Sequence, residues 1–211
     1  MVCPACGAAR SVRGACCRRC RAALAAGGEV RLACGLLVAG PFAHEGTARL
    51  LVHRLKYGAF PAAAGPLAAA MGPLAEGSSA LVPVPRARVR RWHYGVDPAL
   101  ELARRIAALT GVPVVRALAA GWWHPARAGP GERRRGVPRF RRMCSPPHGA
   151  VLVDDVLTTG ATLAAAAAAC PVSRAVVATL ASSGRVGGRP GSIGNRAPQG
   201  APEHGSQRVR E

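Results

Sequence analysis

The sequence has 211 residues, of which 49% are hydrophobic, 4% aromatic and 18% charged, and its formal net charge is +19. This length accommodates one α/β domain and a small additional module, with a core built mainly from Ala, Val and Leu. No apolar run approaches the roughly 20 residues of a transmembrane helix, so we expect no membrane insertion. The positive charge predicts an anionic partner.

Four cysteines near the start of the sequence form two Cys-x-x-Cys pairs. They are Cys3, Cys6, Cys17 and Cys20. Two such pairs can supply four thiolates at tetrahedral geometry, which predicts a structural Zn²⁺ site with no position open for chemistry. A redox pair and adventitious disulfides are the alternatives, but a redox motif rarely comes doubled. Cys16 and Cys34 are further candidate ligands. No secretory apolar region precedes the pairs, so we expect a cytoplasmic protein.

Helical and strand patterns alternate along the rest of the chain. Apolar spacing and helix-ending residues predict helices at 46–57, 61–74, 98–109 and 162–170. Short apolar runs predict strands at 80–84, 112–118, 150–156 and 174–180. An arginine-rich loop is expected over 121–142. This alternation predicts a mostly parallel sheet flanked by helices, an α/β fold.

The composition divides the chain into three parts. Residues 1–34 form the predicted zinc-knuckle module, 35–183 the α/β domain, and 184–211 a basic tail without apolar periodicity, which we expect to be disordered. The tail carries five arginines and two glutamates, so residues 1–183 alone have a net charge of +16.

Two adjacent carboxylates, Asp154 and Asp155, end an apolar strand pattern. Such residues suit the carboxyl end of a strand, where open α/β sheets bind ligands, and they accept hydrogen bonds from sugar hydroxyls. Small and hydroxyl-bearing residues follow, and together with the amides of a helix start they can hold a phosphate. They are Thr158, Thr159, Gly160, Ala161 and Thr162. The order predicts a sugar-phosphate site. The alternative is that Asp155 or Thr159 only caps the helix.

The string from Ala150 to Thr162 resembles the PRPP-binding motif of type I phosphoribosyltransferases. The resemblance implies the type I phosphoribosyltransferase fold, with Asp154 and Asp155 on the ribose hydroxyls of PRPP and residues 158–162 on its 5′-phosphate. It also implies a reaction, in which a nitrogen nucleophile displaces pyrophosphate with the help of Mg²⁺.

Three further segments, together with the cysteine pairs, resemble the ComF family of competence-associated phosphoribosyltransferase-like proteins. They are HRLKYGAF (53–60), ALVPVPRARVRRWHYGVDPALELARRI (80–106) and HPARAGPGERRRGVPRF (124–140). The family has Phe-Asn-Gln where this chain has residues 96–98, and Gln and Asn where it has Arg127 and Gly136. The resemblance therefore implies the ribose and phosphate sites and leaves the acceptor undefined.

Five arginines are candidates for stabilising the departing pyrophosphate. They are Arg86, Arg88, Arg133, Arg134 and Arg135. For any one of them the alternative is a solvated surface position. The sequence indicates no general base, because we expect His93, His124 and His148 in surface loops.

Three functions remain open from the sequence. The first is a PRPP-dependent transferase with an unknown nitrogenous acceptor. The second is a non-catalytic DNA-uptake factor that binds single-stranded DNA or competence proteins, for which Trp92 and Tyr94 would stack on bases beside arginines. The third is a PRPP-sensing regulator.

Overall fold

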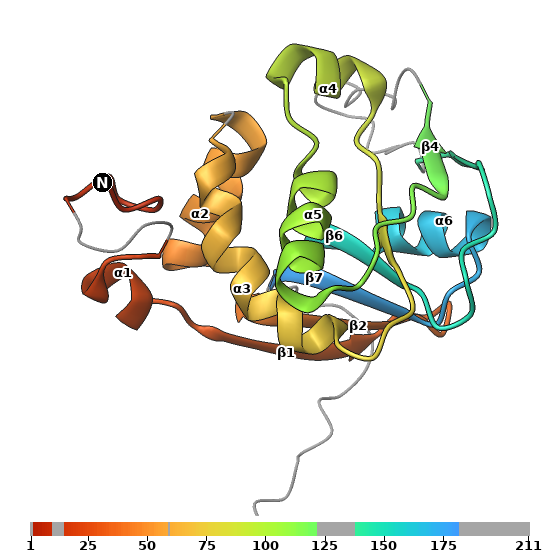
Figure 1. Cartoon of the computed structure of the whole chain (residues 1–211), viewed down its shortest axis with the longest axis horizontal. Coiled ribbons are helices and arrows are strands. Elements are labelled where there is room, and N and C mark those ends of the chain that lie inside the picture. Colours follow the sequence, from red (N-terminus) through yellow and green to blue (C-terminus); the bar gives the residue numbers. More distant parts are fainter. Residues whose placement is uncertain (1, 10–14, 59, 122–137, 182–211) are drawn as a thin grey trace, which may run out of the picture.

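The fold is described from a computed structural model that covers residues 2–9, 15–58, 60–121 and 138–181. A five-stranded sheet with the order β1-β2-β7-β6-β3 forms its centre (Figure 1). The strands from β2 to β3 run parallel, and β1 pairs antiparallel at one edge. The strands of this sheet are β1 (Ala26–Arg31), β2 (Leu37–Ala43), β3 (Leu81–Pro83), β6 (Val151–Leu157) and β7 (Arg174–Leu180).

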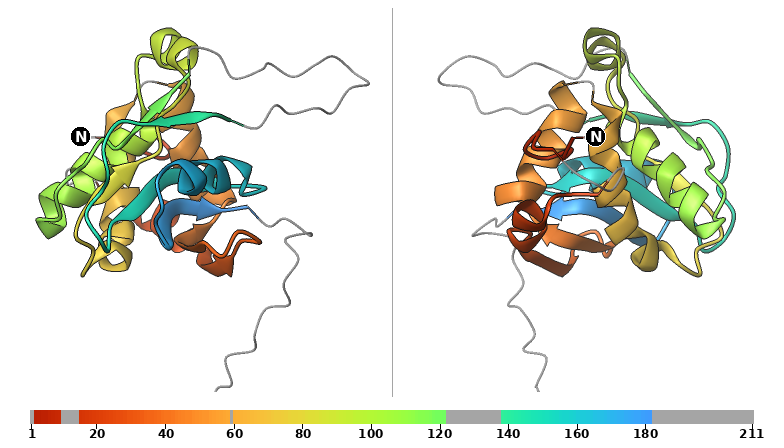
Figure 2. Two further views of the ribbon diagram at one scale, coloured as in Figure 1. Left: turned by 90° about the vertical axis from the view of Figure 1, so that its right-hand side faces the viewer. Right: turned by 60° about the vertical axis from the view of Figure 1, so that its left-hand side comes forward.

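Helices cover both faces of the sheet (Figure 2). On one face α2, α3 and α5 pack over Val153 and Val176, and on the other α6 packs over Leu152 and Val177. The chain is therefore a mixed α/β protein with a mostly parallel sheet, as predicted. The helices are α1 (Arg18–Ala22), α2 (Gly46–Tyr57), α3 (Ala64–Ala75, after a 3₁₀ turn at Pro61–Ala63), α4 (Arg88–Tyr94), α5 (Pro98–Thr110) and α6 (Ala161–Ala169).

The helix signals in the sequence are confirmed. Asp97 is the N-cap of α5, and its Oδ1 accepts a hydrogen bond from the Leu100 N–H at 3.5 Å, with Pro98 in the first turn. Gly111 ends the helix in the left-handed conformation at φ 76°, which suits a residue without a Cβ. These caps fix where α5 starts and stops beneath the candidate site.

Two strands, β1 and β2, were not predicted. Gly27 and Gly28 weaken the strand pattern of β1, and Gly40 and Pro41 weaken that of β2. A side chain at Gly27 would collide with the backbone of Gly40, so the two strands approach closely where glycines face each other. Although β1 lies within residues 1–34, it belongs to the same sheet as the strands of the following domain.

The strand predicted at 112–118 is wrong over most of its length. Only Val114 bridges to Leu81, because β3 is three residues long and Pro83 has no N–H with which to continue the pairing. The chain then forms β4 (Leu118–Ala120), which pairs antiparallel with β5 (Phe140–Arg142). The loop predicted over 121–142 is therefore wrong at its end, and its middle, 122–137, lies outside the described residues.

The arginine-rich stretch after β3, for which no helix was predicted, forms the helix α4. His93, predicted in a surface loop, is exposed on this helix. Arg133, Arg134, Arg135 and the tail 184–211 lie outside the described residues. Within the described ranges, no helix has both the length and the apolarity to cross a bilayer.

Candidate functional site

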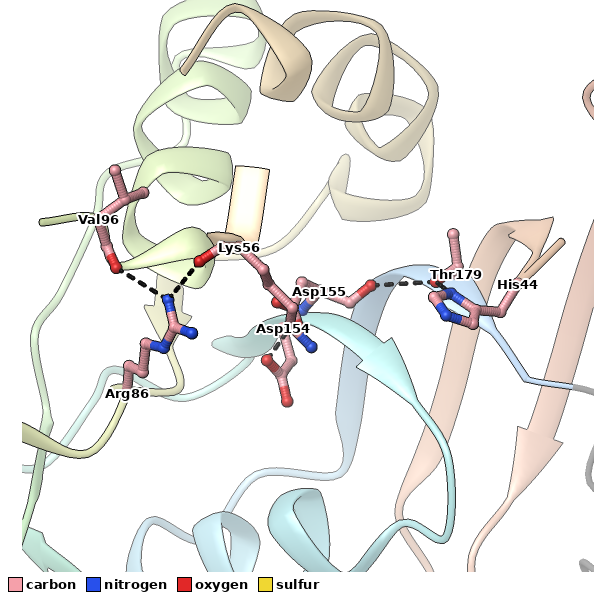
Figure 3. Close-up of polar contacts among 7 residues, drawn as sticks. All are labelled: His44, Lys56, Arg86, Val96, Asp154, Asp155 and Thr179. Carbon is pink, nitrogen blue, oxygen red and sulfur yellow. Dashed lines mark hydrogen bonds and ion pairs between the residues drawn. The ribbon is translucent and has the colours of Figure 1, made fainter. Parts of the chain in front are cut away.

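The two predicted carboxylates lie in the carboxyl-terminal half of β6, just beyond its pairing with β3 and beside β7 (Figure 3). Asp155 is buried, with a side chain 7% exposed, and it forms a 3.0 Å ion pair with the Nζ of Lys56 at the end of α2. Asp154 is partly exposed, and its Oδ1 accepts a 2.8 Å hydrogen bond from the Asp155 N–H. One carboxylate is thus neutralised within the protein, while the other is partly open to a ligand.

Electrostatics distinguishes these groups further. Burial and the neighbouring charge of Asp155 raise the pKa of Asp154 well above its ordinary value, against the attraction of Lys56. Burial opposes the charge on Lys56, but attraction by Asp155 and Asp154 outweighs it, and the pKa of Lys56 is raised. Lys56 therefore stays charged. A hydroxyl donor or a cation that binds Asp154 would stabilise the ionised form of its carboxylate.

The turn after β6 leads into α6 through Gly160, whose φ is 78°. A Cβ on Gly160 would lie 2.8 Å from Cδ2 of Leu32, so the position is closed to larger residues by both conformation and packing. Thr158, Thr159, Ala161 and Thr162 around it are exposed. Since the N-cap is Gly160 and no side chain caps this helix, the alternative in which Asp155 or Thr159 serves as a cap is wrong.

Arg86 ties three segments together beside the acidic strand end. Its Nη1 donates to the carbonyl oxygens of Lys56 at 2.8 Å and Val96 at 3.4 Å. Its guanidinium carbon lies 4.6 Å from the ring centroid of Tyr94 and 5.7 Å from that of Tyr57. Burial lowers the pKa of Arg86, although attraction by Asp155 opposes this effect. The structure therefore brings this predicted arginine next to Lys56, at the end of β3.

Arg88 has a different setting from Arg86. It begins α4 and lines a cavity of about 360 Å³ together with Arg139 and Arg141, whose backbones flank or belong to β5. The two ion pairs found among the described residues do not involve these three arginines. The cavity therefore has a positive lining, which suits an anion.

Lys56, His44 and Thr179 were not among the predicted site residues. The Nδ1 of His44, directly after β2, lies 2.8 Å from Oγ1 of Thr179 in β7, which in turn lies 3.4 Å from the backbone oxygen of Asp155. One feature of the sequence could have pointed to Lys56 as a site residue: it is the single lysine of the chain. His44 follows a strand that was itself not predicted, so nothing placed it at this edge of the sheet.

The four predicted cysteine ligands come together. Their sulfur atoms all lie within 4.8 Å of one another, and those of Cys6 and Cys17 are 3.7 Å apart. A Zn–S distance of about 2.3 Å implies about 3.8 Å between sulfurs at the corners of a tetrahedron. The cluster can therefore bind a metal such as zinc. Cys16 packs in the apolar core instead, and Cys34 is exposed beside another cavity.

The thiols of the cluster differ in acidity. Burial disfavours ionisation of Cys3, but hydrogen bonds from the backbone of Cys17, Cys6 and Ala5 outweigh it and lower the pKa to about 6. Burial and the neighbouring thiols raise the pKa of Cys20 to about 12. A metal ion must displace a tightly held proton from Cys20, so metal binding at this cluster depends on pH.

The cysteine cluster is packed onto α2 (Figure 2, right). Cys3 and Cys20 share an apolar cluster with Leu51 and Leu55 of this helix. Nearby, Arg54 donates from Nη1 to the carbonyl oxygen of Pro4 at 3.3 Å. Because Lys56 ends the same helix, the cysteine cluster supports the element that supplies the partner of Asp155.

The sequence matches no protein-family model, and it matches no curated protein. The chemistry of the acidic strand end has to be inferred from its own residues.

Proposed function

We propose that the protein is a phosphoribosyltransferase-like protein of ComF type that binds PRPP or a related ribose 5-phosphate compound at the carboxyl end of β6. One observation carries this proposal: Asp154 and Asp155 lie in the carboxyl-terminal half of a central parallel strand, and two residues later the chain enters α6 through an exposed threonine turn and Gly160. The carboxylates can accept hydrogen bonds from the ribose hydroxyls, and the amides and hydroxyls of the turn can bind the 5′-phosphate. The two groups therefore match the two ends of a ribose 5-phosphate. The type I phosphoribosyltransferase fold is part of the same proposal.

The environments of the two acids support distinct roles. Asp155 is buried and paired with Lys56, so it mainly fixes the strand end. Asp154 is partly exposed, and its pKa is raised because the protein disfavours its ionised form. Hydrogen bonds donated by a ligand would stabilise that form. In this proposal Asp154 makes the stronger contact with the ribose hydroxyls, while the residues from Thr158 to Thr162 hold the 5′-phosphate.

The proposed reaction displaces pyrophosphate from C1 of the ribose by a nitrogen nucleophile. The C–N bond forms, the C–O bond breaks, and the electron pair of that bond leaves with pyrophosphate. Arg86 and Arg88, which follow β3, place positive charge on one side of the acids, and Arg133, Arg134 and Arg135 are further candidates for the leaving group. Mg²⁺ belongs to the proposal because it neutralises phosphate charge, and the Asp154 carboxylate is an oxygen ligand of the kind it takes.

The four-cysteine cluster has a structural part in this proposal. Zn²⁺ held by Cys3, Cys6, Cys17 and Cys20 would have no ligand position open for chemistry. Its packing against α2 connects it to Lys56 and so to the acidic strand end. Free thiols at this site require the reducing conditions of a cytoplasm.

Thermal unfolding tests the proposal directly. PRPP with Mg²⁺ at millimolar concentration should raise the melting temperature, because a ligand that binds only the folded state stabilises it. Asp154→Asn should weaken this shift, and Asp154→Asn with Asp155→Asn should abolish it. Glu76→Gln, which removes an exposed carboxylate after α3, is the matched control and should keep it. No shift in the wild-type protein would reject the proposal.

A second function, binding of single-stranded DNA as a DNA-uptake factor, is favoured by a separate observation. Trp92 on α4 is 87% exposed, and Arg88, Arg90 and Arg91 lie on the same helix. An exposed indole among arginines suits base stacking beside phosphate contacts. Trp92→Ala should weaken binding of an oligonucleotide and Asp154→Asn should not, with a steep salt dependence in both proteins.

A further inference from the structure

We propose that His44 is the general base of this reaction, and that Nε2 of its ring accepts the proton of the attacking nitrogen. The substrate class follows: the acceptor is an N–H acid, such as a heterocycle or an amide, whose nitrogen attacks well only as its proton is removed. This inference rests on the proposed function of the acidic strand end, and it assigns the side of the sheet from which the acceptor enters.

The strand order gives the direction of attack. Along the sheet, β3 with Arg86 lies on one side of β6, and β7 and then β2 with His44 lie on the other (Figure 3). A nucleophile displaces a leaving group from the opposite face of the carbon atom. If pyrophosphate leaves toward the arginines after β3, the acceptor enters over β7 and β2. Two strand spacings, about 10 Å, separate β2 from β6, and in this proposal the acceptor ring lies over β7, between the sugar and the imidazole.

The hydrogen bonds of Thr179 favour one tautomer of His44. The hydroxyl of Thr179 has one proton, which it donates to the backbone oxygen of Asp155 at 3.4 Å. On this ground we assign the ring proton of His44 to Nδ1, which donates to the Thr179 oxygen at 2.8 Å, so that Nε2 keeps its lone pair. The backbone of His44 is held as well, by a 2.7 Å hydrogen bond from its N–H to the oxygen of Leu180.

The surroundings of His44 keep the ring neutral. Burial lowers its pKa, and the positive charges of Lys56 and Arg49 on α2 act in the same direction. Asp155 on β6 opposes them with a smaller effect. A histidine whose pKa lies below its ordinary value is unprotonated at neutral pH, which is the state that a general base requires.

The lone pair of the acceptor nitrogen forms the bond to C1 of the ribose, and the bond from C1 to the pyrophosphate oxygen breaks with its electrons on that oxygen. The proton leaves the nitrogen for Nε2 of His44 and is later released to water. No further reactant is needed.

Nuclear magnetic resonance of the full chain with ¹⁵N-labelled histidine tests the inference without knowledge of the acceptor. The His44 ring signals are assigned by their loss in His44→Gln. We expect the Nδ1–H tautomer, a titration midpoint below that of an ordinary histidine, and a shift of the Nε2 signal when PRPP and Mg²⁺ are added. Thr179→Val should abolish the tautomer preference. An Nε2–H tautomer, a midpoint at or above that of an ordinary histidine, or a silent His44 at saturating PRPP would overturn the inference and leave PRPP binding intact. Failure of PRPP to bind at all would defeat both proposals.

Pyrophosphate release gives the kinetic test, with adenine, guanine and uracil as N–H probes and ammonia as an acceptor that needs no prior deprotonation. His44→Gln should lower kcat with an accepted heterocycle by about 10²–10⁴-fold, abolish the acidic limb of its pH profile and leave the KM for PRPP unchanged. The rate with ammonia should persist. His148→Gln, which changes an exposed histidine outside the site, is the control.

Two results would exclude His44 as the base. One is a His44→Gln variant that keeps the wild-type kcat with the heterocycle, and the other is an equal loss of kcat with ammonia and with the heterocycle.

Discussion

The acidic strand end and the four-cysteine cluster both gather groups that repel one another when ionised, but they balance the charge in different ways. At the strand end the chain supplies its own cation, because Lys56 forms a 3.0 Å ion pair with Asp155. In the cluster four sulfurs lie within 4.8 Å, and a metal ion is the cation that this geometry fits. The first site is therefore sensitive to substitution, and the second to chelation and pH.

Loss of the metal should have the largest effect. Structural zinc contributes about 10–16 kcal/mol of apparent binding free energy in zinc-finger peptides, and here the ligands Cys3 and Cys20 are also part of the core. A strong chelator, or Cys20→Ser, should lower the melting temperature and release zinc, and acid should release it as well because protons compete for the Cys20 thiol. Metal content and thermal unfolding measure both effects. Cys34→Ser, at an exposed cysteine outside the cluster, should change neither.

Lys56→Met should have the next largest effect, because it leaves Asp155 buried without its partner. Removing one member of a buried pair costs several kcal/mol, and we expect about 2–4 kcal/mol here, since the Lys56 side chain is 26% exposed. Urea unfolding gives the value. Lys56→Met with Asp155→Asn should recover part of the loss.

A second ion pair provides the matched control for Lys56. Arg105 and Glu101 pair at 2.8 Å on the surface of α5. Arg105→Met should cost about 0.5 kcal/mol or less, as is usual for exposed pairs. Equal losses at the two sites would show that the strand end is not specially dependent on its internal cation.

Gly160→Ala should destabilise the turn by about 1–3 kcal/mol, because the residue has φ 78° and a Cβ would meet Leu32. Gly77→Ala isolates the conformational part, since Gly77 has φ 73° and open space around its Cβ position. The difference in the free energy of unfolding between the two variants measures the contact with Leu32. If the variants are equally stable, Leu32 does not constrain the turn.

Local patterns in the sequence were sufficient to predict much of this structure. The N-cap Asp97 and the C-terminal Gly111 bounded α5, and the cysteine spacing identified the four sulfurs that meet. These features depend on residues close together in sequence, so spacing alone carries the information.

What the sequence did not indicate depends on contacts between distant segments. β1 and β2 contain glycines and a proline that hide the strand pattern, and a side chain at Gly27 would collide with the backbone of β2. Lys56 reaches Asp155 of β6 from α2, and His44 reaches Thr179 of β7 from the end of β2, each across about 100 residues of sequence or more. Since neither distance nor orientation can be read from periodicity, the pair of acids was predicted but the groups that set their charge were not.

Asp154→Asn should have a small effect on the free energy of unfolding, and it should be stabilising. Its pKa is raised in the folded protein, so the folded state binds the proton more tightly than the unfolded state does, and stability falls as pH rises from the ordinary value of 3.8 through the raised one. An amide carries no charge and escapes this loss, so we expect a gain of about 1 kcal/mol at neutral pH, or roughly 2–4 °C in Tm.

The pH dependence distinguishes this cause from a general improvement in packing. The Tm curves of the wild-type protein and Asp154→Asn should converge at acidic pH, where Asp154 is protonated in both folded and unfolded chains. The same variant should lose most of its stabilisation by PRPP, because a neutral amide accepts weaker hydrogen bonds from a diol than a carboxylate does. A variant that is less stable at neutral pH would instead show that Asp154 contributes to folding as Asp155 does. The division of the pair into one structural acid, balanced by Lys56, and one acid kept for a ligand would then be wrong.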